Sequence, residues 1–197
     1  MGSESSPTVE VRDLCKQFRV ARREAGLGAA LRALVRREYS QVDAVKALSF
    51  ALGAGERVGF LGPNGAGKTT TLKMLSGLLY PSSGEVRVAG MVPAERRPEF
   101  LRAISLVMGQ KRQLSWDLPA VDTFEFNRVV FDIDARDYRR RLDELVSLLA
   151  VGEVMRRPVR NLSLGERMKC ELVAALLHAP RILFLDEPTI GMDVAMQ

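Results

Sequence analysis

Apolar and polar residues alternate along the first part of the chain, and this pattern predicts strands. Residues 8–20, "TVEVRDLCKQFRV", alternate and turn polar at their end. Residues 47–62, "ALSFALGAGERVGFLG", predict a strand, a Gly-Ala-Gly turn and a second strand, "RVGF". Residues 68–79 then fit a helix, and residues 80–90 hold a Pro/Ser/Gly turn followed by a short strand. From "RVGF" onward, the predicted order is therefore strand, loop, helix, strand.

The second part of the chain predicts a helical insertion between two parts of an α/β core. Residues 95–110 predict a short helix and another strand. Residues 111–160 differ in composition and include a charged stretch. One apolar helical face is predicted there by the spacing of Leu142, Leu145, Val146, Leu148 and Leu149. The nearly all-apolar run in residues 181–188, "RILFLDEP", is typical of a strand covered on both faces of a parallel sheet.

Length and composition indicate one globular domain over residues 1–197, with residues 1–8 as a loose tail. Hydrophobic residues make up 47% of the chain and charged residues 27%. Cys15 and Cys170 lie far apart without CxxC spacing, so neither a disulfide framework nor a zinc site is predicted. No leader-like segment and no apolar run of about 18 residues occurs. We therefore expect a cytosolic protein that meets membranes only through a partner.

The net charge of +5 is spread unevenly, because residues 19–40 hold six arginines against two glutamates, within a basic arm at residues 19–45. Its apolar residues Leu27, Leu31, Leu34 and Val35 fall on one face of a helix. Such a basic amphipathic helix suits an anionic lipid surface. A solvated arm packed on its own domain is the alternative, and the sequence leaves both open.

A phosphate-binding loop is predicted at residues 62–69, where "GPNGAGKT" matches the pattern G-x-x-x-x-G-K-[ST]. The glycines let backbone N–H groups surround phosphate oxygens, Lys68 reaches the β- and γ-phosphates, and the Thr69 hydroxyl is offered to Mg²⁺. The following helix turns its positive end to the same anions. The predicted nucleotide-binding residues here are Gly62, Pro63, Asn64, Gly65, Ala66, Gly67, Lys68, Thr69 and Thr70.

Two carboxylates close the apolar strand "ILFLDE". Asp186 is the candidate to hold Mg²⁺, and Glu187 is the candidate base that orients or deprotonates the attacking water. An apolar strand that simply ends in solvent-facing acids is the alternative. A phosphate-binding loop earlier in the chain favours the catalytic interpretation.

The segments "GPNGAGKTT", "NLSLGE" and "ILFLDEPTIGMD", in this order, resemble the nucleotide-binding subunit of ATP-binding-cassette (ABC) transporters. The resemblance covers nearly the whole chain, and "MGQKRQLSWDLP" makes it most similar to bacterial exporter ATPases whose membrane subunits are separate chains. It implies an α/β fold with a P-loop NTPase core and a mainly parallel sheet. An antiparallel β subdomain and an inserted α-helical subdomain at residues 111–160 would complete it.

The resemblance assigns roles to residues outside the phosphate loop. Gln110 matches the Q-loop glutamine, a metal-contacting and catalytic residue that links the core to the helical subdomain. Phe18 matches the aromatic that stacks on adenine, since a π-face suits a purine. A core aromatic at a strand end is the alternative. Asp193 lies where the family has a loop that touches the other subunit.

The signature loop of the family matches "LSLGE", residues 162–166. Ser163 and Gly165 are thereby implied to bind the γ-phosphate of ATP held by a second subunit, at a positive helix end. Ser163 and Glu166 also fit a capping box, and the two roles are compatible. Leu164 and Glu166 depart from the commoner "LSGGQ", and we expect this to change the affinity for nucleotide rather than the function.

The single histidine and the end of the chain depart from the family pattern. His178 precedes "RILFLDE", so it is not the family's switch histidine; we expect it to end the signature helix with a partly cationic ring. The chain stops at Gln197, before the family's last core strands, and so resembles a truncated product that binds ATP but hydrolyses it poorly.

The predicted function is ATP binding and hydrolysis, with ATP and Mg²⁺, that powers transport through a separate membrane subunit. The resemblance implies a homodimer or paired ATPase subunit, export as the direction, and a place on the cytoplasmic face of the membrane, with no nucleic acid as a partner. Trp116 follows the Q-loop where the membrane subunit would dock, although a core position is the alternative. The other candidates are a soluble ABC ATPase acting on ribosomes or DNA, and a non-hydrolysing ATP-binding fragment.

Overall fold

The computed structural model describes residues 7–21, 39–109 and 113–187. Its contacts divide the chain into two compact units, Met1–Arg96 and Arg97–Gln197. Each unit is described by itself.

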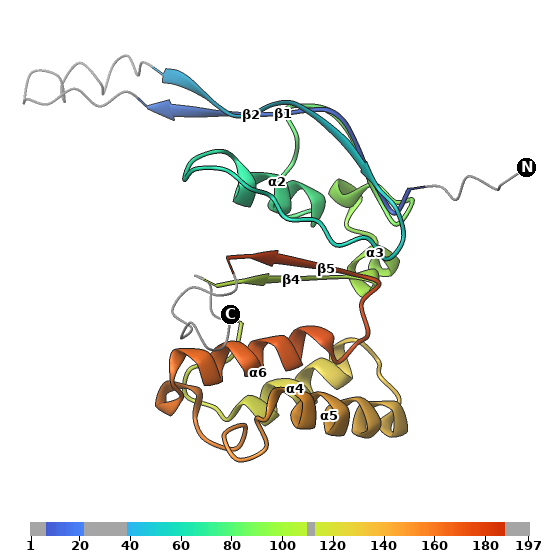
Figure 1. Ribbon diagram of the computed structural model, residues 1–197, viewed down its shortest axis with the longest axis vertical. Coiled ribbons are helices and arrows are strands. Elements are labelled where there is room, and N and C mark those ends of the chain that lie inside the picture. The colour runs from blue at the N-terminus through green and yellow to red at the C-terminus, as the bar shows by residue number, and fades with distance from the viewer. Residues whose placement is uncertain (1–6, 22–38, 110–112, 188–197) are drawn as a thin grey trace, which may run out of the picture. The chain divides into compact units, whose positions relative to one another are not determined.

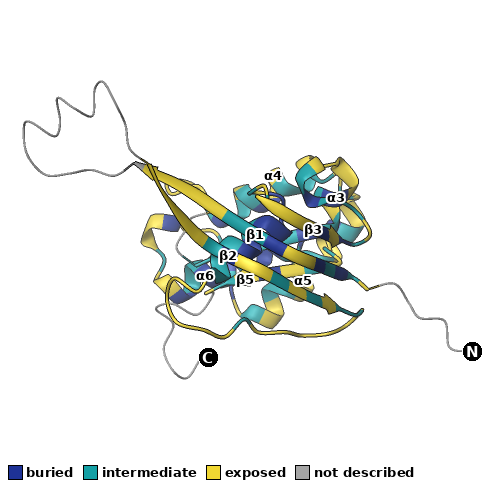
Figure 2. Cartoon of the chain, turned by 90° about the horizontal axis from the view of Figure 1, so that it is seen from above, coloured by how far each residue is buried: buried dark blue, intermediate teal, exposed yellow. Residues whose placement is uncertain are grey.

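A three-stranded antiparallel sheet forms the frame of the first unit (Figure 1). Strand β1 (Val9–Ala21) lies in the middle, between β2 (Tyr39–Leu52) and β3 (Ser83–Val88). The buried residues of β1 all lie in the part that pairs with both neighbours, and the strand is exposed beyond it (Figure 2). The sheet therefore continues past its core as a two-stranded ribbon.

Two predicted segments have boundaries in or beside these strands. Strands β1 and β2 contain both ends of the predicted basic arm, while residues 22–38, with the predicted helical face, lie outside the described residues. The Thr8 N–H donates to the Leu52 carbonyl at 2.7 Å, and the Thr8 carbonyl accepts from Ala89 at 2.7 Å. Thr8 is thus part of the folded unit, because the sheet satisfies its backbone groups.

Helix α2 (Lys68–Leu75) packs against β2 and β3. It ends four residues before the end predicted from the sequence. Gly77 adopts a left-handed φ of 72°, and the N–H groups of Leu78 and Leu79 turn back to the Lys73 carbonyl. This is how a glycine commonly terminates a helix, so the apolar Leu78 and Leu79 belong to the turn.

The strand predicted at "RVGF", residues 57–60, is not formed in the described structure. A strand requires a neighbour that pairs with its backbone groups, and in the first unit β1 pairs with β2 and β3 while residues 57–60 join none of these strands. The segment is held instead by the Phe60 ring, which meets Phe50 edge to face with centroids 5.6 Å apart. The next residue, Leu61, is 97% exposed.

The second unit begins with a short helix and contains a parallel strand pair. Helix α3 (Pro98–Ala103) leads into β4 (Ile104–Met108), which pairs in parallel with β5 (Ile182–Asp186). The register sets Met108 beside Asp186 at the carboxyl ends of the strands. The 3-10 turn η1 (Pro93–Glu95) ends the first unit. Both predicted strands are confirmed.

Four helical segments build the rest of the second unit. They are α4 (Ala120–Val130), α5 (Ala135–Leu149), the 3-10 turn η2 (Val159–Asn161) and α6 (Leu164–Leu176). One hydrophobic cluster joins them, with Phe124, Tyr138, Val159 and Val173 among its buried members. Four of the five predicted α5 face residues pack on this cluster, but Leu148 is 78% exposed, so its place on that face was predicted wrongly.

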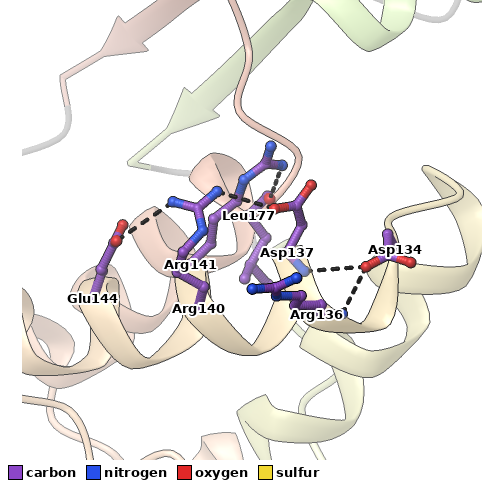
Figure 3. A network of polar contacts seen from close by, with 7 residues as sticks. All are labelled: Asp134, Arg136, Asp137, Arg140, Arg141, Glu144 and Leu177. Carbon is purple, nitrogen blue, oxygen red and sulfur yellow. Dashed lines mark hydrogen bonds and ion pairs between the residues drawn. The ribbon is translucent and has the colours of Figure 1, made fainter.

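Polar contacts fix the ends of α5 and α6 (Figure 3). The Asp134 carboxylate caps the start of α5, and Arg140 pairs with Asp137 and Glu144 along its surface. Arg141 donates to the Leu177 carbonyl at the end of α6 at 3.2 Å. A cation at this position complements the negative end of the helix.

The element types confirm the predicted α/β class. The antiparallel sheet lies in the first unit, and the parallel pair and the helical group lie in the second. Within residues 7–21, 39–109 and 113–187, no helix is long and apolar enough to cross a membrane.

Candidate functional site

The loop before α2 is shaped by glycines that no other residue can replace without strain. Gly65 and Gly67 have left-handed φ values of 86° and 88°. A Cβ on Gly67 would lie 2.3 Å from the Ala44 carbonyl oxygen of β2. Close packing against β2 thus fixes the point at which the loop becomes a helix.

The start of α2 is built to receive an anion. Gly67 occupies the cap position, no side-chain cap is present, and the first turn holds no acidic residue. The Lys68 ammonium folds over the loop and donates to the carbonyls of Gly62 at 2.6 Å and Pro63 at 2.9 Å. Phosphates are bound by backbone N–H groups, a helix N-terminus and a lysine. The residues here supply all three, so they fit a nucleoside triphosphate.

Phe18 lies on the exposed part of β1, where it is 37% exposed. Its cross-strand partner is Val42, and the Lys16 ammonium lies 5.2 Å from its ring centroid. This excludes the core-aromatic alternative. The ring stays accessible for stacking, which is what the adenine role requires.

The carboxylates stand at the end of β5 in the second unit. The Gly109 N–H donates to the Asp186 carbonyl at 3.0 Å, which extends the β4–β5 pairing past Met108. A Cβ on Gly109 would lie 2.3 Å from the Glu187 carbonyl oxygen. Gly109 is thus bonded to Asp186 and lies close to the Glu187 backbone, whereas Gln110 lies outside the described residues.

The start of α6 carries the predicted capping box. The Ser163 hydroxyl accepts from the Glu166 N–H at 3.2 Å, and the Glu166 carboxylate accepts from the Ser163 N–H at 2.8 Å. The Ser163 N–H, followed by its hydroxyl, holds the pKa of the Glu166 carboxyl below its usual value. The buried Gly165 lies within the first turn.

Comparison with known proteins decides the family. The family described as "ABC transporter" matches residues 45–190. The chain belongs to the ABC transporter ATP-binding family. This confirms the resemblance found in the sequence, and the matched residues include the phosphate loop, the α6 capping box and the β5 carboxylates.

Several curated ABC proteins are similar over most of this chain. The ABC transporter ATP-binding protein NatA of Bacillus subtilis is 33% identical over 78% of the chain. The linearmycin resistance ATP-binding protein LnrL of the same species is 33% identical over 81%, and the daunorubicin resistance ATP-binding protein DrrA3 of Streptomyces coeruleorubidus is 36% identical over 80%. The chain spans 62%, 51% and 49% of these three relatives, respectively.

Solved structures share the ABC fold. An ATP-binding subunit of an ABC transporter has a TM-score of 0.74 at 23% identity, over 95% of this chain and 69% of that one. A dimeric ATP-binding cassette in a post-hydrolysis state, bound to ADP and Pi, has a TM-score of 0.73 at 23% identity, over 95% of this chain and 77% of its own. At this identity the likeness establishes the fold.

The two units divide the predicted ABC site residues between them. The first unit holds Phe18 and the loop from Gly62 to Thr70, and the second holds Ser163, Gly165, Asp186 and Glu187. Within the second unit, Gly109 brings the strand that leads to Gln110 against the two carboxylate residues. Asp193 and Gln110 lie outside the described residues.

The importance of two residues of this ABC chain was not predicted from the sequence. Gly109 is required for close approach to β5, and its signal was a glycine directly after the strand "ISLVM". Glu171 lies inside α6 and is only 1% exposed, 3.6 Å from the Arg167 Nε. Burial raises the pKa of the Glu171 carboxyl. A lone acid within the apolar run of α6 could have identified it.

His178 corrects a prediction about the end of the signature helix. It does follow the end of α6, but its ring is stacked on Phe131 with centroids 4.0 Å apart, and its Nε2 lies 3.1 Å from the Ile104 carbonyl oxygen. Burial lowers the pKa of His178, which disfavours the partly cationic ring that was expected. Arg141 supplies the cation at the helix end instead.

Proposed function

We propose that this chain binds and hydrolyses ATP as a single ABC ATPase domain and powers transport through a separate membrane subunit. The observation that carries the proposal is the start of α2, which lacks a side-chain cap, is fixed by Gly67 and is covered by Lys68. A helix end with these donors is suited to the phosphates of a nucleotide. Phe18 offers an exposed ring for the adenine base.

The metal would be held by side-chain oxygens: a hydroxyl, an amide oxygen and a carboxylate. Thr69, Gln110 and Asp186 are the residues of this chain suited to Mg²⁺, which prefers oxygen ligands. When bound, the ion supplies positive charge next to the phosphates. Lys68 contributes a second positive charge, and Glu187 accepts the proton of the attacking water.

A second subunit completes the proposed site. Ser163 and Gly165 stand at a positive helix end and carry the donors that suit the γ-phosphate of ATP bound to the partner. The chain would therefore work as a homodimer or with a paired ATPase subunit. The dimeric cassette among the structural neighbours supports this arrangement.

Exposed apolar residues of the second unit support a membrane subunit as partner. Trp116 is 39% exposed and Leu118 is 48% exposed in the segment before α4. Phe126, Val129 and Val130 form an exposed apolar stripe on α4. Such surfaces are typical of protein contacts. Residues 111–160 would act as the helical subdomain that receives this partner at the cytoplasmic face of the membrane.

The names of the relatives support export as the direction. LnrL and DrrA3 are described as resistance proteins, and the protein YbhF of Escherichia coli, 34% identical over 80% of this chain, as a probable multidrug transporter protein. The cargo would be selected by the membrane subunit.

The test compares ATP turnover and dimer formation in the full chain and in Glu187→Gln. We expect the parent to hydrolyse Mg-ATP, and Glu187→Gln to bind ATP, lose turnover and accumulate as a dimer in size-exclusion chromatography, because the base is missing while the binding groups remain. Parent-level hydrolysis by Glu187→Gln would show that Glu187 is not the base. Absence of an ATP-dependent dimer would contradict the two-subunit site.

A further inference from the structure

The segment between β4 and α4 is fastened to α6 at its beginning. We call residues 113–119 the post-β4 loop. Its residue Leu114 is buried in the same hydrophobic cluster as Cys170 and Val173 of α6. The Gln113 side chain also donates to the Leu106 carbonyl of β4 at 2.5 Å. The loop thus starts from a fixed position between a core strand and the signature helix.

The second half of the post-β4 loop is paired with the chain that leads into α6. The Arg160 N–H donates to the Trp116 carbonyl at 3.0 Å, and the Val159 N–H donates to the Leu118 carbonyl at 3.0 Å. The Arg160 guanidinium also binds the Asp117 carboxylate at 2.8 Å. We call this pairing of residues 116–119 with residues 158–160 the brace.

From the brace, the chain reaches the start of α6 in an unbroken series of hydrogen bonds. The Asn161 N–H donates to the Pro158 carbonyl at 2.9 Å, and the Leu162 N–H donates to the Val159 carbonyl at 3.1 Å. Ser163 follows directly and is held by its capping box with Glu166. Only two residues separate Arg160 from Ser163, and both belong to this ordered path.

We propose that the brace is a mechanical link that carries displacement of the post-β4 loop to Ser163, with Arg160 and Asp117 as its positioning residues. The inference rests on the proposed function, because it assumes that Ser163 binds nucleotide and that a partner contacts the exposed Trp116 and Leu118. Arg160 touches neither nucleotide nor reacting atoms. It acts by holding the Trp116 backbone and the turn before α6 in fixed positions relative to each other.

Trp116 makes the link measurable because it is the single tryptophan of the chain. Acrylamide quenching of its fluorescence in the full chain reports the exposure of the loop, without nucleotide. Ser163→Ala should raise the quenching constant of Trp116 about twofold, as expected when a cap at the other end of a coupled segment is lost. In an Arg160→Ala background the same change should have little effect.

Charge reversal separates the ion pair from general damage to the loop. Asp117→Arg alone and Arg160→Asp alone should uncouple Trp116 from Ser163, whereas the double exchange should restore coupling, since the opposite charges again face each other. Each single reversal should remove the roughly twofold effect of Ser163→Ala on the Trp116 quenching constant, and the double exchange should recover it at least in part, because an exposed ion pair contributes modestly. Arg156→Ala, an exposed arginine outside the brace, is the matched control and should behave as the parent.

A second readout uses Glu187→Gln with Mg-ATP. We expect ATP to shift Trp116 emission, and Arg160→Ala to reduce the shift while ATP still binds. An equal shift with and without Arg160 would overturn the link and leave the proposed function standing. Failure to bind ATP would overturn the proposed function, but the nucleotide-free experiment would still test the link. If Ser163→Ala leaves the Trp116 quenching constant of the parent unchanged, the link is contradicted.

Discussion

Two helix starts in this protein are proposed to bind phosphate, and they are built in opposite ways. Helix α2 begins at a glycine, with no side-chain cap and no acid in its first turn. Helix α6 begins at Ser163, whose hydroxyl and N–H are both engaged by Glu166. The first start offers its donors to a ligand, while the second already contains an anion of its own.

The difference indicates a division of labour between the two starts. An uncapped helix end leaves N–H groups that require a partner, so the α2 start gains most from bound phosphate. A capping box stabilises the α6 start without ligand, so this helix holds its shape before nucleotide arrives. Glu166 also places negative charge beside the site and should make binding there weaker. We expect the first start to bind ATP and the second to close on it.

The largest effect is expected from Gly67→Ala, which attacks the geometry of the α2 start. The new Cβ would meet the Ala44 carbonyl oxygen at 2.3 Å, and alanine is strained at a φ of 88°. We expect a loss of about 2–5 kcal/mol in the free energy of unfolding, from backbone strain and overpacking together. Urea denaturation followed by circular dichroism measures it.

Gly55→Ala is the matched control for backbone strain alone. Gly55 also has a left-handed φ, 77°, but nothing lies within 4 Å of the position of a Cβ. We expect a loss of only about 1–2 kcal/mol. Equal losses for the two variants would show that close packing against β2 does not shape the α2 start.

A smaller effect is expected from Ser163→Ala, which removes the cap of α6. Loss of an N-cap serine costs about 1 kcal/mol of stability. Thermal denaturation measures the change, and Ser147→Ala, an exposed serine within α5, should be nearly neutral. An unchanged melting temperature for Ser163→Ala would mean that the capping box does not hold this helix start.

The smallest effect on stability is expected from Glu166→Gln, with a clear dependence on pH. The pKa of Glu166 is lowered in the fold, so its carboxylate stabilises the folded state above the unfolded pKa, near 4.5, and this contribution is lost as pH falls through the lower folded pKa. At pH 7 the parent should exceed Glu166→Gln by about 0.3–1 kcal/mol. Below the folded pKa the difference should vanish, as urea titrations at both pH values would show.

Glu166→Gln also tests how the charge of Glu166 affects nucleotide binding at the α6 start. Removing the carboxylate beside the signature loop should strengthen ATP-driven dimerisation in the Glu187→Gln background by about two- to fivefold, since one negative charge near the triphosphate is gone. Weaker dimerisation would mean that Glu166 assists nucleotide binding.

The sequence predicted those features of the molecule that depend on local chemistry. Helix capping needs only Ser163 and Glu166 at the right spacing, and the phosphate loop needs only its glycines and Lys68, so both were visible in a single stretch of chain. The apolar runs of β4 and β5 likewise predicted strands, which the structure confirms as a parallel pair.

Features that depend on contacts distant in the sequence were missed or misjudged. The segment "RVGF" has a strand pattern, but a strand forms only when a neighbour pairs with it. The need for Gly109 arises from Glu187, and the brace joins loop residues to a turn more than forty positions later, as the Asp117–Arg160 pair shows. Burial, which depends on the neighbours of a residue, also lowers the pKa of His178.

Calorimetric titration of the full chain with Mg-ATP, beside Lys68→Ala, tests whether the α2 start holds the triphosphate. We infer that it does so through its backbone donors and Lys68. We predict saturable binding by the parent and none measurable by Lys68→Ala, with both proteins equally folded by circular dichroism. Equal affinities for the two proteins would contradict the claim.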